Sequence, residues 1–226
     1  MTEHSETDVA VEPPRIVLIR HGESNATVER RIAGHRTCTG LSALGVEQAE
    51  RLRERLADSG ELAVDRLVSS TFTRAKETAQ VIAPALGLEV EIDDRFGEHD
   101  PGPELDGLRF QAYIERFGMP DWHGDPHFPV FPGGETAAEF HLRVGAALSE
   151  TAAKSAGQTV VIVCHGGVID VVFRQLLRMP PTGSFELQTL NTSLTEFLRP
   201  TPGRWRIVRY NDSAHLAGLP AATRTD

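Results

Sequence analysis

Residues 15–24 read RIVLIRHGES, and this stretch decides the fold. Its first six residues include an unbroken apolar run between two arginines, which is typical of a strand that is covered on both faces, as in a parallel sheet. A second strand of this kind is predicted at residues 158–164, where β-branched side chains fill the middle. Each strand stops at a histidine followed by glycine, His21-Gly22 and His165-Gly166. Because ligands of parallel sheets bind at the carboxyl ends of the strands, we expect the two histidines to meet there.

Helices and strands alternate along the rest of the chain, which predicts an α/β fold, a three-layer α/β/α sandwich with a mostly parallel central sheet. The first predicted helix should bury Val46, Ala49, Leu52 and Leu56 on one stripe, and Pro84 should kink or end the second. The sequence predicts helices at residues 42–57, 72–86, 135–154 and 168–177, further strands at 66–70 and 88–92, and a closing antiparallel pair at 187–198 and 204–210.

The chain is expected to fold as one domain, residues 15–211, with a tail at each end. Residues 1–14 are polar, end in two prolines and are predicted to be disordered, and residues 212–226 form a predicted C-terminal tail. Between residues 96 and 134 the periodic pattern is lost in a stretch rich in proline, glycine and aromatic residues. We interpret this stretch as an irregular insertion over the active site.

Composition excludes several classes of function. The 226 residues carry a net charge of −9, and an acidic surface repels nucleic acid and anionic lipid. No apolar run is long enough to span a bilayer, and residues 1–14 contain no basic residue of the kind that opens a signal peptide. Two cysteines cannot form a disulfide framework, so a reducing, cytoplasmic compartment is expected.

A third polar element follows the predicted strand at residues 66–70. Arg74 lies in the first turn of the next helix, where the helix dipole repels a cation unless an anion is bound. Arg20 and Arg74 together could grip phosphate oxygens, and His165 with the amide of Gly166 would add further donors. A neutral imidazole attacks phosphorus well, which makes His21 the candidate nucleophile.

These motifs resemble the histidine phosphatase superfamily, also called the phosphoglycerate-mutase-like fold, over roughly residues 15–209. The shared stretches are Arg20-His-Gly-Glu-Ser24, Leu41-Ser-Ala-Leu-Gly-Val-Glu-Gln-Ala49, Ser69-Ser70 through Arg74-Ala75, Pro132-Gly-Gly-Glu-Thr136, His165-Gly-Gly167 and Asn191-Thr-Ser193.

The resemblance implies that His21 becomes transiently phosphorylated and that Arg20, Arg74 and His165 hold the phosphoryl group. It also implies an acid that protonates the leaving oxygen and then helps water to attack. By its place after the third strand this acid is Glu98, with Asp100 as the alternative. The implied chemistry needs no metal and no cofactor, because arginines supply the positive charge.

Three positions depart from the family pattern. Thr27 stands where the family usually has an asparagine that contacts phosphate, so a hydroxyl is expected to replace that contact. The stretch 34–40 is one residue longer than the common version and lacks its aspartate. Cys164 stands where serine is common, and we interpret it as an inert core thiol rather than a nucleophile.

Phosphatase activity on a small phosphomonoester is the favoured function. Mutases of the family resemble one another in a tyrosine and a lysine shortly after the catalytic glutamate, whereas His99, Asp100, Pro101 and Gly102 follow Glu98 here. A mutase and a catalytically inactive phospho-ligand binding module are the alternatives. The sequence leaves open whether the chain forms a homo-oligomer.

The insertion allows two interpretations. Its aromatic residues could pack it into a small subdomain, or they could form an apolar rim that accepts a bulky phosphomonoester. His123 and His127 with Asp121 or Asp125 suggest a metal site, but Gly124 and Pro126 argue against regular helical presentation and no third ligand cluster is evident.

Overall fold

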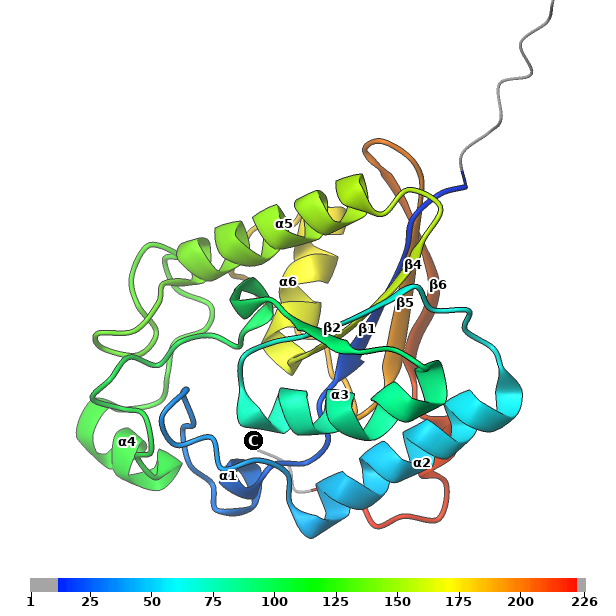
Figure 1. The fold of residues 1–226 in the computed structure, drawn as a ribbon. Coiled ribbons are helices and arrows are strands. Elements are labelled where there is room, and N and C mark those ends of the chain that lie inside the picture. The colour runs from blue at the N-terminus through cyan, green and yellow to red at the C-terminus, as the bar shows by residue number, and fades with distance from the viewer. Residues whose placement is uncertain (1–11, 223–226) are drawn as a thin grey trace, which may run out of the picture.

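A computed structural model describes residues 12–222 and contains a six-stranded sheet between two layers of helices (Figure 1). The strand order is β3-β2-β4-β1-β5-β6, in which β1 to β4 pair in parallel and β5 and β6 pair antiparallel. The predicted three-layer α/β fold is therefore confirmed. The strands are β1 (Arg15–Arg20), β2 (Arg66–Ser69), β3 (Val90–Ile92), β4 (Thr159–Cys164), β5 (Leu194–Thr201) and β6 (Arg204–Asp212).

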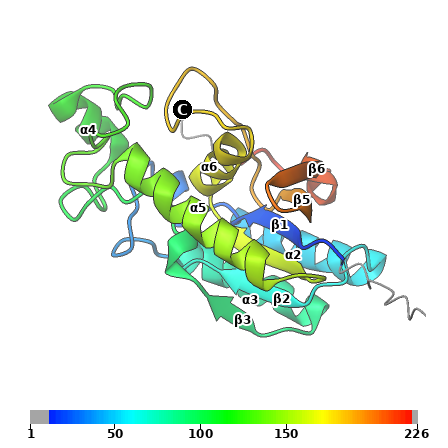
Figure 2. The same ribbon diagram turned by 90° about the horizontal axis from the view of Figure 1, so that it is seen from above.

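Helices α5 and α6 cover one face of the sheet, and α2 and α3 cover the other (Figure 1). The helix α4 belongs to the insertion and lies at the end of the molecule away from β6 (Figure 2). The helices are α1 (Asn25–Val28), α2 (Ala43–Ser59), α3 (Thr73–Leu86), α4 (Phe110–Phe117), α5 (Ala137–Lys154) and α6 (Gly166–Leu176), with 3₁₀ turns η1 (Asp94–Phe96) and η2 (Ala214–Leu216).

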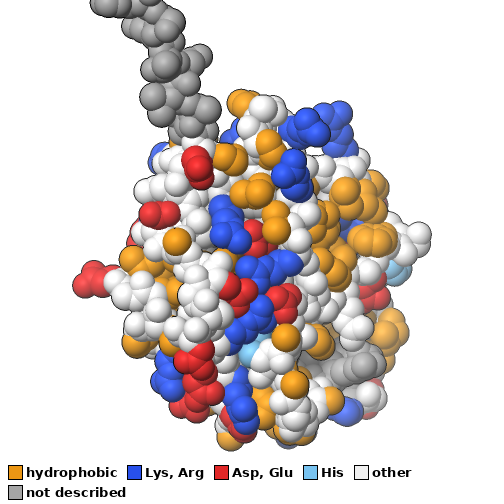
Figure 3. All heavy atoms as spheres, turned by 90° about the vertical axis from the view of Figure 1, so that its right-hand side faces the viewer, with side chains coloured by type: hydrophobic (Ala, Val, Ile, Leu, Met, Phe, Trp, Pro, Cys, Tyr) orange, Lys and Arg blue, Asp and Glu red, His pale blue; other side chains and the backbone are white. Residues whose placement is uncertain are grey.

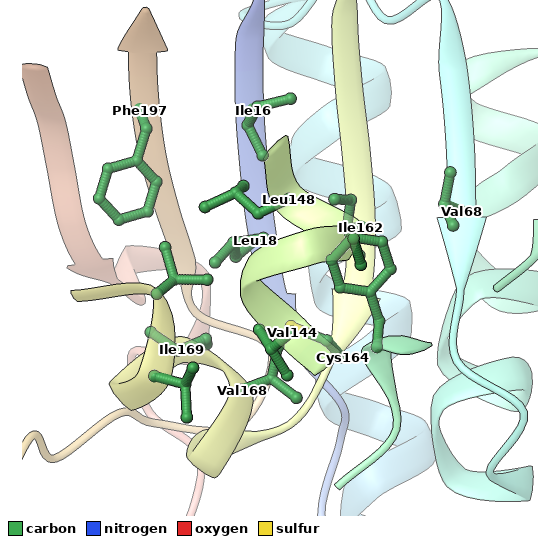
Figure 4. Packing of buried hydrophobic residues seen from close by; sticks show 14 of the residues in the cluster. Ile16, Leu18, Val68, Val144, Leu148, Ile162, Cys164, Val168, Ile169 and Phe197 are labelled. Atoms are coloured by element: carbon green, nitrogen blue, oxygen red, sulfur yellow. The ribbon is translucent and has the colours of Figure 1, made fainter. Parts of the chain in front are cut away.

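The apolar residues of β1 belong alternately to two hydrophobic cores, because successive side chains of a strand point to opposite faces of the sheet. Ile16 and Leu18 pack toward α5 and α6 in a core that also holds Ile162 and Cys164 of β4 (Figure 4). Val17 and Ile19 pack toward α2 and α3. Both layers of helices are thus anchored on β1, and its carboxyl end is held in a fixed place.

Helix α2 approaches the backbone after β1 through a pair of glycines. A Cβ on Gly22 would lie 2.5 Å from the carbonyl oxygen of Gly45, and one on Gly45 would lie 2.0 Å from that of Glu23. The buried stripe of α2 therefore contains Gly45 and Gln48 beside Ala49, Leu52 and Leu56. The prediction that Val46 belongs to this stripe is wrong: it is 40% exposed, because Gly45 is the residue that faces the loop.

Several helices and strands begin or end at residues other than those predicted. Helix α6 begins at Gly166 rather than 168, directly after His165, its N-cap. Pro84 lies in the last turn of α3, which runs on to Leu86 and ends at Gly87 in the left-handed conformation. Strand β5 begins at Leu194 rather than 187, because residues 187–193 turn over the carboxyl end of β1.

Both ends of the described chain are attached to the rest of the fold. The carbonyl of Glu12 accepts from the amide of Gly157, and that of Pro14 accepts from Arg199, so these residues are not part of a free tail. The prediction that a tail begins at 212 is also wrong, because Asp212 ends β6 and η2 packs against α2. Residues 1–11 and 223–226 of the predicted tails lie outside the described residues.

An ion-pair network ties β6 to the rest of the fold. Arg209 pairs with Glu196 of β5 and with Glu61, and Arg55 of α2 pairs with Glu61 and Asp212. Figure 3 shows basic and acidic side chains interleaved in this way along the face on the right-hand side of Figure 1. Within residues 12–222, no helix is long and apolar enough to cross a membrane.

Candidate active site

The segment after β1 is fixed by backbone hydrogen bonds. The amide of His21 donates to the carbonyl of Cys164 at 3.0 Å, which continues the pairing of β1 with β4. The carbonyl of His21 accepts from the side-chain amide of Asn191 at 2.8 Å, and the amide of Gly22 donates to Thr78 Oγ1 at 3.0 Å. These bonds fix the backbone position of His21.

The imidazole of His21 presents Nε2 as its basic nitrogen. Nδ1 lies 2.6 Å from the carbonyl oxygen of Gly22, and because a carbonyl can only accept, Nδ1 carries the proton. Nε2 accepts from Nε of Arg74 at 3.0 Å. Burial, together with the positive charges of Arg74 and Arg20, holds the pKa of His21 well below 6.5. The ring is thus neutral at physiological pH, as a nucleophile must be.

Arg74 reaches the site from the first turn of α3, as predicted. Its guanidinium lies over the ring of Phe72, 4.5 Å from the ring centre, and its Nη1 donates to Cys38 Sγ at 3.4 Å. Arg74 is buried, although no carboxylate among residues 12–222 forms an ion pair with it. This geometry fits an arginine that receives its counter-charge from a bound anion.

His165 lies against His21 at the carboxyl end of β4. Their ring centres are 5.0 Å apart, and Phe72 packs edge-on against His165 at 4.9 Å. Nε2 of His165 is 2.8 Å from the hydroxyl of Ser70, whereas Nδ1 is buried and has no hydrogen-bond partner within residues 12–222. Burial first, and then the charge of Arg74, hold the pKa of His165 well below 6.5.

Arg20 completes a ring of donors around His21. Its Nη1 donates to the carbonyl of Thr189, and its Nε is buried without a partner. A Cβ on Gly166 would lie 3.7 Å from that Nε and 3.6 Å from the hydroxyl of Thr189, which is also buried and unpartnered. Among the described residues, Nε of Arg20, the hydroxyl of Thr189 and Nδ1 of His165 are therefore buried and unsatisfied, the first two of them beside Gly166, the residue after His165. A site for an oxyanion requires such free donors.

Glu98 lies against the first turn of α6. Its Oε2 accepts from the amide of Gly167 at 3.2 Å, and its Oε1 accepts from the amide of His99 at 3.0 Å. Asp100, the alternative acid, instead uses Oδ1 to accept from the amide of Gly102 and closes a turn. The geometry favours Glu98, because its carboxylate adjoins the helix start that follows His165.

A cleft of about 560 Å³ opens beside Glu98. Five carboxylate side chains line it, and its two arginines are both engaged in ion pairs, Arg95 with Asp93 and Arg143 with Glu135, one of the five. His35 lines the cleft and packs against Phe72 with ring centres 3.9 Å apart, and Phe72 in turn contacts His165. The approach to the site is therefore acidic.

Thr27 makes its side-chain hydrogen bond with a neighbouring residue at the start of α1. Its hydroxyl is 3.0 Å from that of Ser24, which also caps α1 by accepting from the amide of Thr27. A phosphate contact by Thr27 stays a prediction. Cys164 points into the core beside α5 and α6, and burial raises the pKa of its thiol, as expected for an inert side chain (Figure 4).

The two histidines of the insertion lie in turns that are closed by aspartate side chains. Asp121 accepts from the amide of His123 and Asp125 from that of His127, while Nδ1 of His123 lies 2.7 Å from the carbonyl of Gly183. Within residues 12–222, no three histidine, cysteine or acidic side chains gather as metal ligands.

The aromatic residues of the insertion divide into two groups. Tyr113 and Phe131 pack with Leu105 in a small apolar cluster, which agrees with the subdomain interpretation. Trp122 and Phe128 remain 44% and 71% exposed, so an apolar rim for substrate stays a prediction. Phe96 belongs to the main core beside α5 rather than to the insertion.

Four further residues of the site were not predicted from the sequence: Ser70, Thr189, Asn191 and Cys38. Ser70 and Asn191 belong to motifs shared with the family, and these motifs could have indicated them. Thr189 was predicted to lie in a strand, and Cys38 contacts Arg74 from a distant part of the sequence, so no neighbouring residues indicated a role for either.

The comparisons with known proteins agree with this geometry. The model of the histidine phosphatase superfamily (branch 1) matches residues 16–213, and the chain belongs to this family of phosphoryl-transfer enzymes. The chain is 34% identical over 210 residues to phosphoglycerate mutase-like protein 4 of Arabidopsis thaliana, covering 91% of this chain and 88% of that protein.

Two solved phosphatases have the same fold. The mycobacterial glucosyl-3-phosphoglycerate phosphatase superposes with a TM-score of 0.71 at 28% identity, covering 89% of this chain and all of that one. The α-ribazole phosphatase of Shigella flexneri superposes with a TM-score of 0.76 at 25% identity, over 88% of this chain and 97% of that one. The family predicted from the motifs is confirmed.

Proposed function

We propose that this chain is a phosphatase that hydrolyses small phosphomonoesters through a phosphohistidine on His21, without a metal or cofactor. The observation that carries the proposal is the tautomer of His21: Nδ1–H is held by Gly22, and the lone pair of Nε2 faces Arg74. A neutral, oriented imidazole among arginines is suited to attack a phosphate ester.

In the first step, Arg74 turns from Nε2 to a phosphoryl oxygen and the Nε2 lone pair attacks phosphorus. The bond from phosphorus to the leaving oxygen breaks, and the carboxyl of Glu98 gives that oxygen its proton. Arg20, Arg74, Nδ1 of His165 and the hydroxyl of Thr189 stabilise the charge on the three remaining oxygens. In the second step, Glu98 takes a proton from water, the water oxygen attacks phosphorus, and the bond to Nε2 breaks.

The acidic cleft supports a phosphatase over a mutase. A mutase of three-carbon acids must hold a carboxylate-bearing intermediate above the site, which requires free cationic groups. The cleft beside Glu98 instead presents carboxylates, and Arg95 and Arg143 are neutralised by their partners. We therefore expect substrates whose alcohol part carries no carboxylate.

The mutase remains the second candidate, because the curated relative is named a phosphoglycerate mutase-like protein. Phosphate release from p-nitrophenyl phosphate in excess EDTA, compared among the parent, His21→Ala and the matched control His123→Ala, tests the proposal. We expect equal activity in the parent and in His123→Ala and none in His21→Ala. Loss of activity on chelation would overturn the mechanism, and interconversion of phosphoglycerates faster than hydrolysis would favour the mutase.

A further inference from the structure

The Pro-Gly-Gly-Glu-Thr stretch, residues 132–136, is one of the shared motifs, yet it sends no side chain to the four phosphate-binding residues. Thr136 caps α5 in a capping box with Glu139. Glu135, one residue earlier, binds Arg143 two turns further along the helix, with Nε and Nη2 each 2.8 Å from a carboxylate oxygen. This bidentate pair is largely buried.

Arg143 uses its remaining donors on the segment that carries Glu98. Nη1 donates to the carbonyls of Arg95 at 2.9 Å and Gly97 at 3.1 Å, and Nη2 donates to the carbonyl of Glu98 at 3.4 Å. The five N–H groups of the guanidinium thus correspond to five contacts, three of them with backbone carbonyls of residues 95–98. A lysine could not reproduce this planar arrangement.

The motif holds the other side of Glu98 as well. The amide of Glu135 donates to the carbonyl of Asp100 at 2.9 Å, and the amide of Asp100 donates to Oε2 of Glu135 at 3.3 Å. A Cβ on Gly134 would lie 2.5 Å from the carbonyl oxygen of Asp100, so only glycine allows this approach. Residues 95–98 are therefore held by Arg143, and residue 100 by Glu135.

We infer that Arg143 and Glu135 are positioning residues for the general acid, fixing the backbone on both sides of Glu98 so that its carboxyl meets the leaving oxygen. This inference rests on the proposed function, in which Glu98 donates that proton. A displacement of about 1 Å in a catalytic group can cost roughly 100-fold in rate. In kcat/KM, which reports the phosphorylation step alone, the cost should appear only where the leaving oxygen needs the proton, which is for poor leaving groups.

The experiment measures kcat/KM for a series of aryl phosphates of rising leaving-group pKa and for an alkyl phosphate. The variants are Arg143→Lys, Glu98→Gln and the double variant. Arg174→Lys is the matched control, since Arg174 also pairs with a carboxylate, Asp170, and donates to the backbone carbonyls of Pro180 and Phe185.

We expect Arg143→Lys to lower kcat/KM by about 3-fold or less for the best leaving group and about 30-fold or more for the alkyl phosphate, mostly through kcat. In the Glu98→Gln background the same change should cost less than about 2-fold, because the acid is already absent. Arg174→Lys should show no dependence on the leaving group. The activity retained toward the best leaving group also shows that Arg143→Lys folds.

An equal loss for every leaving group, or a full multiplicative loss in the double variant, overturns the inference. If Arg143→Lys fails to fold, Glu135→Gln replaces it and must show the same dependence, and a flat profile there overturns the inference equally. A parent protein that releases no phosphate overturns the proposed function itself. An active parent with a steep Glu98→Gln profile and a flat Arg143→Lys profile overturns the positioning role alone.

Discussion

Nε of Arg74 donates a hydrogen bond of 3.0 Å to Nε2 of His21, so the cation that would hold the phosphoryl group also occupies the lone pair that would attack it. The bond keeps Nε2 unprotonated and directed at the site. In the proposed mechanism, the oxygens of an incoming phosphate compete for Arg74 and release the nucleophile. Binding of the anion and exposure of the lone pair would then be one event.

Replacing Arg74 by lysine tests this relationship. A lysine retains the charge but not the fork that can contact His21 and an oxyanion in turn. We expect Arg74→Lys to lower kcat by about 100-fold or more, as for the loss of one oxyanion donor. Arg116→Lys, on the exposed end of α4, is the control and should leave kcat unchanged. Steady-state kinetics measure both, and parent-like kcat in Arg74→Lys would contradict the relationship.

The buried histidines should make the fold sensitive to acid. Burial lowers the pKa of His21 and His165 well below 6.5 in the folded state, whereas the unfolded chain binds protons below about 6.5. The unfolded state therefore binds more protons as the pH falls from 6.5 to 5. The free energy of unfolding should drop by about 1.4 kcal/mol per pH unit for each such histidine.

Urea unfolding at several pH values in this window measures that slope. Comparison of the parent with His165→Asn isolates one histidine from the carboxylates that titrate lower. The slope should decrease in the variant by about 1.4 kcal/mol per pH unit, the contribution of one proton. An unchanged slope would show that His165 is protonated in the folded protein.

The glycine contact between α2 and the loop after β1 predicts a large effect from one methyl group. In Gly45→Ala the new Cβ would overlap the carbonyl oxygen of Glu23, a backbone atom that cannot rotate away. We expect a loss of about 3 kcal/mol in the free energy of unfolding, together with a loss of kcat as the loop carrying His21 moves. Val46→Ala, one residue on and half-exposed, should change both quantities little. A stable, active Gly45→Ala would show that the helix can retreat without disturbing His21.

Asp106 connects the insertion to residues 34–38, the segment whose Cys38 contacts Arg74. Its carboxylate accepts from the amides of Gly34 and Arg36 and from the hydroxyl of Thr37. Asp106→Ala leaves these donors without their acceptor, which should lower the free energy of unfolding by about 2 kcal/mol. Asp121→Ala, which removes a single exposed turn contact, is the control. Equal effects of the two changes in chemical denaturation would argue against the link.

Sequence periodicity predicted those parts of the site that depend on the sheet. Arg20 ends β1, His21 follows it and His165 follows β4, and the rule that parallel strands end at one edge was enough to bring them together. Arg74 was found because a cation in a first helical turn is electrostatically unusual.

Long-range side-chain contacts could not be predicted in this way. The contact of Asp106 with residues 34–37 and that of Arg143 with residues 95–98 join segments of no common period. Residues 187–193 were predicted as the start of a strand, yet they turn: Thr192 has a positive φ of 55°, its amide donates to the carbonyl of Arg20, and the carbonyl of Thr189 accepts from the Arg20 side chain. Local propensity carries no record of such partners, and tertiary contacts decide the outcome.

The most direct test of the central claim is to trap the phosphorylated enzyme. Rapid acid-free quenching of Glu98→Gln during turnover of a radiolabelled aryl phosphate should accumulate the intermediate, because water then lacks its base. We expect a radiolabel on the protein that is stable to base and labile to acid. It should be confined to the peptide containing His21 and absent from the His21→Ala, Glu98→Gln double variant. Turnover without label on His21, or label that survives in the double variant, would contradict it.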